Sequence, residues 1–445
     1  MEYKVFGCKV NKYYTDKWLN SEKLKWKSGI FIASCVVTDN AKRKWIKFVK
    51  DTFKTNPHLT SSKGRGTVFI SGCGAFKDWR AQEDFFELYP ELKEYKNKIV
   101  ILWEDPDEVD IKNWQKILTV KQKQISKNKI KNISKSLLWL YTKKFILIQW
   151  GCDSFCTFCL TVIKRWRHFS RAKEDILEDI LDFEKQGGKE VVLTWINLAA
   201  WGLDTTNPPS NSLPIKEGWF KIKSRLWELL EYLLENSSIP RIRISSMGPE
   251  FIDEKCFEIF KNTRIYPHFH YSVQSWSSEV LKNMKRHYNW EHLRNVLKKT
   301  MNLEREDWVK ISIWADIIVW FPGETKKDFG QSLDLIKNYW IKKVHAFPFS
   351  GHELWENVPA GFFENQIDWK TKKERMWEIM NLSDEIREEF IDKNIWDTLE
   401  VLIEVAKEWK WKWWTQNYIE ANSDNFEIIS WKIEKNEIVI WKLIK

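Results

Sequence analysis

The sequence predicts an α/β protein with an N-terminal parallel-sheet domain, a central partial barrel of six β/α units and a small C-terminal β-barrel. Short apolar runs alternate with amphipathic helical stretches over most of the chain, which is typical of parallel sheets. The last fifty residues instead alternate apolar and polar side chains, as short antiparallel strands do. The expected divisions are a domain over 1–110, a lysine-rich linker over 111–143, the barrel over 144–365, a connecting helix over 366–396 and the C-terminal module over 397–445.

Length and charge limit the possible classes of protein. A chain of 445 residues can form several cores, and its net charge of +10 favours a polyanionic partner. Neither a signal peptide nor an apolar run long enough for a membrane span is visible, so we expect a cytoplasmic protein. Its seven cysteines are odd in number and widely spread, which fits a reducing compartment.

Tryptophan is abnormally frequent, with 29 residues beside only 16 glycines. Several tryptophans occupy positions where a bulky side chain is awkward, such as Trp320 before Phe-Pro-Gly-Glu, Trp276 after Val-Gln-Ser, and Trp409, Trp411 and Trp413 in a predicted turn. Tight turns favour a residue without a Cβ atom. We hypothesise that the source reads the codon UGA as glycine; the alternative is a protein that is truly rich in tryptophan, and the intact mass would distinguish the two.

In the N-terminal domain, three strand-like runs each end at a cysteine. The runs are Tyr3–Phe6, Gly29–Ala33 and Thr67–Ile70, and the cysteines that follow them are Cys8, Cys35 and Cys73. Helical stretches separate them, the first from about Tyr13 to Lys27 and the second from Asp39. Because parallel strands end at one edge of a sheet, we expect the three thiols to meet there and hold a metal cluster. Plain buried thiols are the alternative.

The barrel is predicted from six strand-like runs with helical stretches between them. The runs are Phe145–Ile148, Val191–Ile196, Arg241–Ser245, His268–Val273, Ile311–Val319 and Val344–Phe347. A site in such a fold lies at the carboxyl ends of the strands. Polar residues expected just past those ends are therefore candidates for holding a cofactor, and otherwise cap loops or helices: Asn197, Ser245, Ser246, Gln274 and Asp316.

The first barrel strand leads into a C-x3-C-x2-C set formed by Cys152, Cys156 and Cys159. Structural zinc usually has four protein ligands in short-spaced pairs, and no second pair follows. Three thiolates suit a [4Fe–4S] cluster better, because one iron is left free to bind a small molecule. Zinc and ordinary buried thiols are the alternatives.

The remaining segments are less specific. The lysine-rich stretch between Asp110 and Lys144 loses periodicity and is predicted to be a linker or a solvated helix. A long helix is expected over Gln366–Lys393, followed from Leu399 by short strands that suggest a small barrel, a frequent RNA-binding design.

Taken together, these motifs resemble the methylthiotransferase family of radical S-adenosylmethionine (SAM) enzymes over nearly the whole chain. Besides the C-x3-C-x2-C set, the resemblance rests on Gly7-Cys8-Lys9-Val10-Asn11, Cys35-Val36-Val37-Thr38, Ser71-Gly72-Cys73, Arg165-x-Arg167 with Ser170-Arg171, Pro267-His268-Phe269-His270 and Phe321-Pro322-Gly323-Glu324-Thr325. Lys9-Val10-Asn11 and Ile196-Asn197-Leu198 are more similar to the threonylcarbamoyladenosine tRNA branch than to the isopentenyladenosine branch.

The family resemblance implies a fold and a set of cofactors. It implies a flavodoxin- or Rossmann-like N-terminal domain, a radical SAM partial barrel and a TRAM-like C-terminal module containing Thr415-Gln416-Asn417-Tyr418. It also implies two [4Fe–4S] clusters, one on Cys152, Cys156 and Cys159 that cleaves SAM to a radical, and one on Cys8, Cys35 and Cys73 that supplies sulfur. The expected partners of this monomer are a tRNA anticodon stem-loop and an electron donor such as flavodoxin or ferredoxin.

The chain departs from the family at several glycine positions, where it has tryptophan: Trp150, Trp166, Trp195, Trp276, Trp314 and Trp320. Trp195 belongs to the expected cofactor-binding set, and as a real side chain it would crowd the cofactor pocket together with Trp276. Trp201 and Trp414 stand where the family tolerates an aromatic residue. One alternative is a methylthiotransferase acting on isopentenyladenosine tRNA or on a ribosomal protein. If the tryptophans are real, the other is a non-catalytic iron–sulfur RNA-binding protein.

Overall fold

A computed structural model describes residues 1–56, 67–75, 85–102, 141–161, 164, 168–194, 196–203, 224–351, 358–404, 413–421, 425–429 and 434–444. They fall into two compact units, Met1–Leu140 and Tyr141–Lys445, which we treat separately. The predicted linker over 111–143 lies outside the described residues except for 141–143. Within the described parts, no helix has the length and apolar character needed to cross a membrane.

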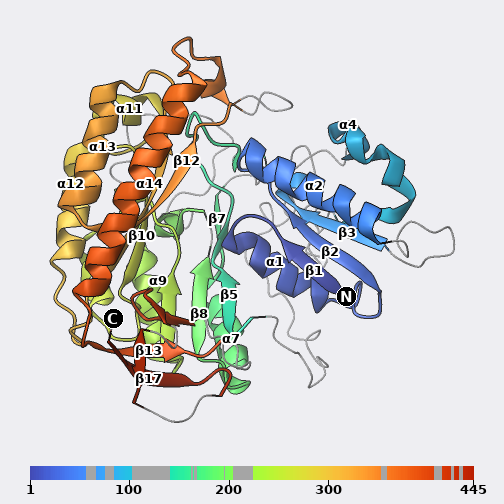
Figure 1. Ribbon diagram of the computed structural model, residues 1–445. Helices are drawn as coiled ribbons and strands as arrows, with labels where there is room; N and C mark the ends of the chain where they lie inside the picture. Colours follow the sequence, from blue (N-terminus) through green and yellow to red (C-terminus); the bar gives the residue numbers. More distant parts are fainter. Residues whose placement is uncertain are drawn as a thin grey trace. The chain divides into compact units, whose positions relative to one another are not determined.

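The first unit contains a four-stranded parallel sheet with the order β1-β2-β3-β4 (Figure 1). Its strands are β1 (Glu2–Val5), β2 (Gly29–Ser34), β3 (Thr67–Gly72) and β4 (Ile99–Ile101), and its helical segments are α1 (Lys9–Leu19), α2 (Asp39–Thr55), η1 (Cys73–Ala75), α4 (Phe85–Leu88) and η2 (Pro90–Lys98). The predicted parallel sheet is present. Its described strands follow one another sequentially, without the switch point of a Rossmann or flavodoxin order.

Alternation along the strands explains why both faces of this sheet are covered. Phe31 and Phe69 pack with Trp18 of α1, whereas Ile30 and Ile32 face the opposite way and pack with Trp45 of α2. Helix α1 begins four residues earlier than predicted because the chain turns at Gly7, whose φ of +95° is accessible to glycine.

The second unit contains the six predicted barrel strands, each within a few residues of its expected limits. They are β5 (Lys143–Leu147), β8 (Glu190–Thr194), β9 (Arg241–Ile244), β10 (His268–Gln274), β11 (Ser312–Val319) and β12 (Ile341–Pro348). They form two parallel sheets, β5-β8-β9 and β10-β11-β12. A parallel bridge between Met247 and Tyr271 joins the two, so the strands run in sequential order as a partial barrel.

Helices cover the outside of this barrel (Figure 1). They are α7 (Lys173–Lys185), α9 (Leu226–Asn236), α10 (Glu254–Phe260), α11 (Ser278–Asn283), α12 (Trp290–Met301), α13 (Lys326–Asn338) and α14 (Trp369–Asp392). Side-chain caps fix several of their starts: Asn289 accepts from the backbone of His292, and Thr325 forms a reciprocal capping box with Asp328. Helix α14, the predicted connecting helix, packs along β12.

The C-terminal residues form one antiparallel sheet with the order β15-β14-β13-β17-β16. The strands are β13 (Thr398–Leu402), β14 (Trp413–Thr415), β15 (Glu420–Ala421), β16 (Phe426–Ile428) and β17 (Ile438–Leu443). The expectation that Trp413 lies in a turn is wrong. It begins β14 and is buried against Trp441, with ring centroids 5.0 Å apart, because the apolar face of this sheet needs large side chains.

The tight turn between β14 and β15 inserts Tyr418 under the amino-terminal ends of the barrel strands. The Tyr418 ring lies 4.4 Å from the ring of His268 and 4.1 Å from the guanidinium carbon of Arg243. Lys342, buried in β12, donates hydrogen bonds to the carbonyls of Asn417 at 3.1 Å and Tyr418 at 2.7 Å. The C-terminal sheet is therefore joined to the barrel through polar as well as apolar contacts.

Beside this turn, Glu190 of β8 is a fully buried carboxylate surrounded by cations. Arg243 donates to it at 3.0 Å, Arg241 lies at 3.4 Å and Lys143 at 3.6 Å. Burial alone would raise the pKa of Glu190, but these three cations outweigh that effect and lower the pKa to about 2. Glu190 therefore stays ionised and compensates the cations buried around it.

Candidate iron–sulfur and cofactor site

The C-x3-C-x2-C set lies in a loop after β5, as predicted. The loop is anchored by a short antiparallel pair, β6 (Gln149–Trp150) with β7 (Phe169–Ser170). Within the loop, the Cys159 amide donates to the Cys156 carbonyl at 3.1 Å, which forms a tight turn between these two cysteines. Cys156 is buried, whereas Cys152 and Cys159 are half-buried.

Each of the three sulfurs has a polar neighbour. Ser154 Oγ lies 3.5 Å from Cys152 Sγ, Thr161 Oγ1 lies 3.0 Å from Cys159 Sγ, and Arg286 Nη1 donates to Cys156 Sγ at 3.4 Å. Burial and, after it, the negative charge of Cys156 raise the pKa of Cys152 to about 12. A positive metal centre would remove this penalty, since a coordinating thiol is held deprotonated.

The three sulfurs do not all lie within 4.8 Å of one another, as the ligands of one ion would. Among the described residues, one group of three metal-binding side chains has all its ligand atoms within 4.8 Å of one another, and it contains no cysteine. The ligands of a single zinc ion would have to converge that closely. In an iron–sulfur cluster each thiolate binds a different iron, so the three sulfurs stand further apart. The donor set of Cys152, Cys156 and Cys159 therefore fits a [4Fe–4S] cluster.

Arg286 connects this loop to β10 and was not identified from the sequence. Its guanidinium reaches Cys156, donates to the Ser272 carbonyl at 3.1 Å and lies 3.5 Å from Glu250. The hydroxyl of Tyr288 donates to the same carbonyl at 2.9 Å. A single arginine after a helix gives no spacing signal, so only the folded chain shows that it touches a cluster ligand.

The predicted cofactor-binding residues occupy different places. Asn197 follows β8, and its Oδ1 accepts from the Gly248 amide at 2.8 Å, which ties two loops together. Ser245 is buried, and its hydroxyl has no partner among the described residues. Gln274 ends β10 in the left-handed conformation, with φ +66°. Trp195 lies outside the described residues.

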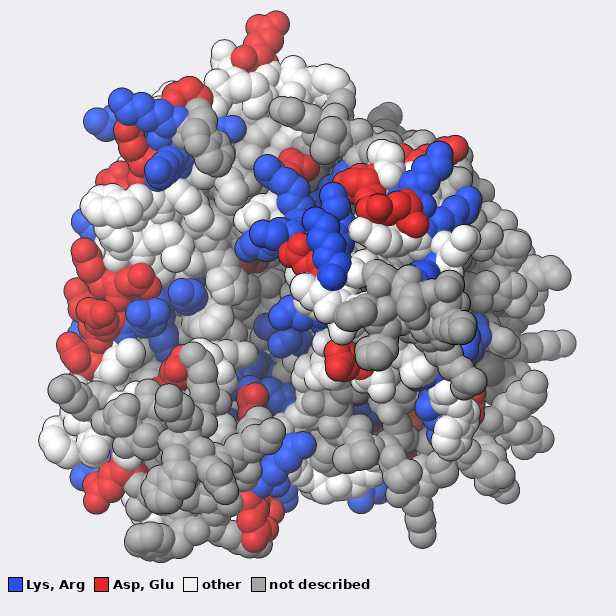
Figure 2. Space-filling view, turned by 45° about the vertical axis from the view of Figure 1, so that its right-hand side comes forward, with Lys and Arg blue, Asp and Glu red and all other residues white. Residues whose placement is uncertain are grey.

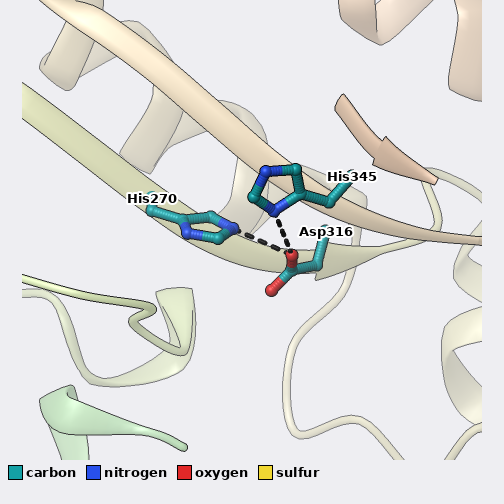
Figure 3. Close-up of side chains that lie close together, drawn as sticks. All are labelled: His270, Asp316 and His345. Carbon is teal, nitrogen blue, oxygen red and sulfur yellow. Dashed lines mark hydrogen bonds and ion pairs between the residues drawn. The ribbon is translucent and has the colours of Figure 1, made fainter. Parts of the chain in front are cut away.

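Asp316 lies inside β11, so the expectation that it follows the strand is wrong in position. Figure 3 shows its carboxylate facing two histidines from the neighbouring strands. Asp316 Oδ1 is 2.9 Å from His270 Nε2 and 3.3 Å from His345 Nδ1. Burial would raise the pKa of Asp316, but the two histidines lower it well below its usual range. Ser246, another predicted residue, places its hydroxyl 3.2 Å from His270 Nδ1.

Trp276 contacts residues of the outer helices. Its ring centroid is 6.3 Å from that of Trp290 at the start of α12 and 5.6 Å from that of Tyr339 after α13. With Ser277, Lys327 and neighbouring residues, it lines a cavity of about 400 Å³. The crowding of a cofactor by Trp276 stays a prediction.

In the first unit, Cys8, Cys35 and Cys73 follow β1, β2 and β3 at the same edge of the sheet. The loops there are tightly joined. A Cβ atom on Gly7 would lie 2.6 Å from Cys35 Sγ, so the backbone next to Cys8 runs against the Cys35 thiol. Asn11 donates to the carbonyls of Phe6 at 2.6 Å and Ser34 at 2.8 Å. Cys8 is exposed, and Cys35 and Cys73 are buried.

Comparison with known proteins identifies the enzyme class. Residues 146–336 match the model of the radical SAM superfamily. The chain is 26% identical over 461 residues to the threonylcarbamoyladenosine tRNA methylthiotransferase MtaB of Bacillus subtilis, an alignment that covers 99% of this chain and 92% of the relative. The chain is an MtaB-like radical SAM methylthiotransferase.

Two further similarities of this MtaB-like enzyme are narrower. It is 31% identical to the tRNA-2-methylthio-N(6)-dimethylallyladenosine synthase of Alkaliphilus oremlandii, over 59% of this chain and 51% of that protein. A structural neighbour is the radical SAM methyltransferase TsrM from Kitasatospora setae, with a TM-score of 0.45, 11% identity and coverage of 78% of this chain and 72% of that one.

Proposed function

We propose that this MtaB-like enzyme adds a methylthio group to carbon 2 of threonylcarbamoyladenosine next to the tRNA anticodon, in the cytoplasm. The observation that carries the proposal is the extent of the alignment. Alignments with MtaB relatives cover 84–99% of this chain, and three of the four exceed 95%. Alignments with dimethylallyladenosine synthases cover 59–85% of it. A match that extends through the first unit and the C-terminal sheet includes the parts that would contact the substrate.

Two [4Fe–4S] clusters would supply the redox and sulfur chemistry, one held by Cys152, Cys156 and Cys159 and the other by Cys8, Cys35 and Cys73. The chain's own residues prepare the first site. Arg286 places a positive charge against the Cys156 sulfur and fixes the adjacent backbone of β10 through Ser272. The buried hydroxyl of Ser245 offers an unused hydrogen bond to SAM.

The tRNA anticodon stem-loop is the proposed partner, and helix α2 is one candidate contact surface. It exposes Arg43, Lys44, Lys47 and Lys54 on its solvent side, where they could neutralise phosphates. Figure 2 shows basic side chains interspersed with acidic ones over the face in view, so the charge does not form one continuous basic surface there. The C-terminal sheet, which we interpret as a TRAM-like module, would provide a second contact.

Two cysteine variants test the assignment of the clusters. With reduced, reconstituted protein, we expect Cys156→Ala to abolish SAM cleavage, and Cys35→Ala to retain cleavage but lose methylthiolation. Cys256→Ala is the matched control, since Cys256 is a buried thiol of helix α10 outside both sets. Full methylthiolation by the Cys35 variant would contradict the second cluster.

Nucleoside mass spectrometry of tRNA from cells with and without the gene tests the substrate. We expect 2-methylthio-threonylcarbamoyladenosine to disappear without the gene while 2-methylthio-isopentenyladenosine persists. Loss of the latter would favour the other tRNA branch. Intact tRNA modification with an unmodified ribosomal protein would favour a ribosomal target. Failure of the wild-type protein to cleave SAM would favour an iron–sulfur RNA-binding protein without catalysis.

A further inference from the structure

We propose that His270, Asp316 and His345 bind a divalent first-row transition ion, tested first as Zn²⁺, inside the barrel. The three side chains come from the neighbouring strands β10, β11 and β12, and their ligand atoms all lie within 4.8 Å of one another. Asp316 and His345 are direct partners in the register of β11 and β12. The parallel sheet therefore holds the donors in place, and no loop has to close over the ion.

Two of these ligands, His270 and Asp316, have hydrogen-bond partners behind them, as ligands in known metal sites do. A histidine that binds a metal usually forms a hydrogen bond through its other ring nitrogen, and a ligating carboxylate is hydrogen-bonded in turn. Here Ser246 Oγ lies 3.2 Å from His270 Nδ1, and Ser272 Oγ lies 3.5 Å from Asp316 Oδ2. The proposed ligand atoms are His270 Nε2 and His345 Nδ1, with Asp316 Oδ1 at 2.9 Å from the first and 3.3 Å from the second.

The donor set selects the class of ion. Two imidazoles and one carboxylate suit Zn²⁺ or Fe²⁺, whereas Mg²⁺ and Ca²⁺ prefer oxygen ligands alone. Three protein ligands leave a coordination position open for water or a substrate atom. The His345 side chain is 35% exposed and that of Asp316 16%, so an ion can reach the site. Ser272 also links it to the cluster loop, because its carbonyl accepts from Arg286.

Metal binding can be measured without any assay of methylthiolation. Protein with both clusters reconstituted is stripped of loosely bound ions, so that the cysteines are occupied, and Zn²⁺ is added in competition with a chromophoric chelator. We expect one Zn²⁺ per chain in addition to the cluster iron. His345→Gln should weaken the affinity by roughly 100-fold or more, since loss of even an outer-shell partner costs 10–100-fold.

A matched control and a second variant keep the test decisive. His292→Gln should bind Zn²⁺ as the wild type does, because His292 bonds to the Pro249 carbonyl on another part of the barrel. Asp316→Asn keeps the side-chain shape and should also lose the ion. Absence of Zn²⁺ binding by the wild type, or equal binding by the wild type and His345→Gln, would show that the three residues form only a hydrogen-bonded chain.

A second inference rests on the backbone. In the described residues, nine residues other than glycine have a positive φ, and four of them are tryptophans: Trp308, Trp320, Trp340 and Trp396. Tryptophan supplies only 29 of the 445 residues. The left-handed conformation is uncommon for residues with a Cβ atom and is an outlier for bulky ones, whereas glycine adopts it freely. We infer that these four positions are glycine in the protein that the source organism makes.

The surroundings of the four tryptophans support this inference. Trp340 follows Tyr339, the C-cap of α13, at the position where a left-handed glycine commonly ends a helix. Trp308 and Trp396 are 87% and 65% exposed, so packing does not compensate for their conformation. Trp320 is buried, and its indole N–H has no partner among the described residues. By contrast, Trp201 is buried and donates to the Arg171 carbonyl at 3.1 Å, as a genuine tryptophan would.

Peptide mass spectrometry of the protein isolated from its source decides the matter. We expect glycine at positions 308, 320, 340 and 396 and tryptophan at position 201. Tryptophan at 308, 340 and 396 would overturn the inference, and glycine at 201 would show that the substitution is not restricted to strained positions.

Discussion

The exposed turn at Trp308 allows backbone strain to be measured almost free of packing effects. Trp308 has φ +56° between α12 and β11 and is 87% exposed. A residue with a Cβ atom in this conformation costs about 1–2 kcal/mol. Replacement by glycine removes that cost but gives the unfolded chain more freedom, worth about 0.4–1 kcal/mol. We therefore expect Trp308→Gly to increase the free energy of unfolding by about 0.5–1 kcal/mol.

A second exposed tryptophan provides a control of opposite sign. Trp377 is 69% exposed but lies within helix α14, where glycine is less favourable than tryptophan by roughly 0.3–0.7 kcal/mol. Thermal unfolding of the two variants should show midpoints displaced in opposite directions, by about 1–3 °C each. If Trp308→Gly lowers the midpoint as much as Trp377→Gly does, the turn is not strained and the reasoning is refuted.

Three further predictions concern charge. Glu190→Gln should destabilise the second unit by about 3–5 kcal/mol, because it leaves buried cations uncompensated. The folded pKa of Glu190 is about 2, below the ordinary glutamate value near 4.5. Its contribution to the free energy of unfolding is therefore present above pH 4.5 and is lost as the pH falls from 4.5 toward 2. The unfolding free energies of wild type and variant should converge in that range. The double substitution Lys44→Gln and Lys47→Gln should weaken tRNA binding. It should also reduce the slope of log affinity against log salt concentration by about 0.7–0.9 for each phosphate that is no longer neutralised. An unchanged slope would exclude α2 as a binding surface. Arg286→Lys keeps the charge but cannot bond to Cys156 and the β10 backbone together, so SAM cleavage should slow by roughly 10–100-fold with the cluster iron content retained.

The sequence predicted the strands well because their signal is local. Apolar runs such as Val191–Ile196 are too short for a typical helix and are rich in β-branched residues, and their alternation with helical stretches predicts the parallel pairing that β8 forms with β5 and β9. The cysteines after β1, β2 and β3 could be grouped for the same reason, since topology alone brings strand ends together.

Residues whose role depends on a contact across the fold could not be predicted. His345 is an ordinary strand residue until the register of β11 and β12 places it opposite Asp316. Asp316 itself was expected beyond its strand, because sequence patterns locate strand ends only approximately. Trp413 was assigned to a turn because lysines alternate with tryptophans around it, yet the tertiary core of the C-terminal sheet determines its place.

Tyr418 packs the C-terminal sheet against the amino-terminal ends of the barrel strands. Its ring packs against His268 and Arg243, and its carbonyl accepts from the buried Lys342. A truncated chain ending before β13 would expose these side chains to water and leave the Lys342 amine without the Asn417 and Tyr418 carbonyls as acceptors. When domains are exchanged between relatives, the C-terminal sheet and the barrel should therefore be transferred together, because each covers side chains of the other.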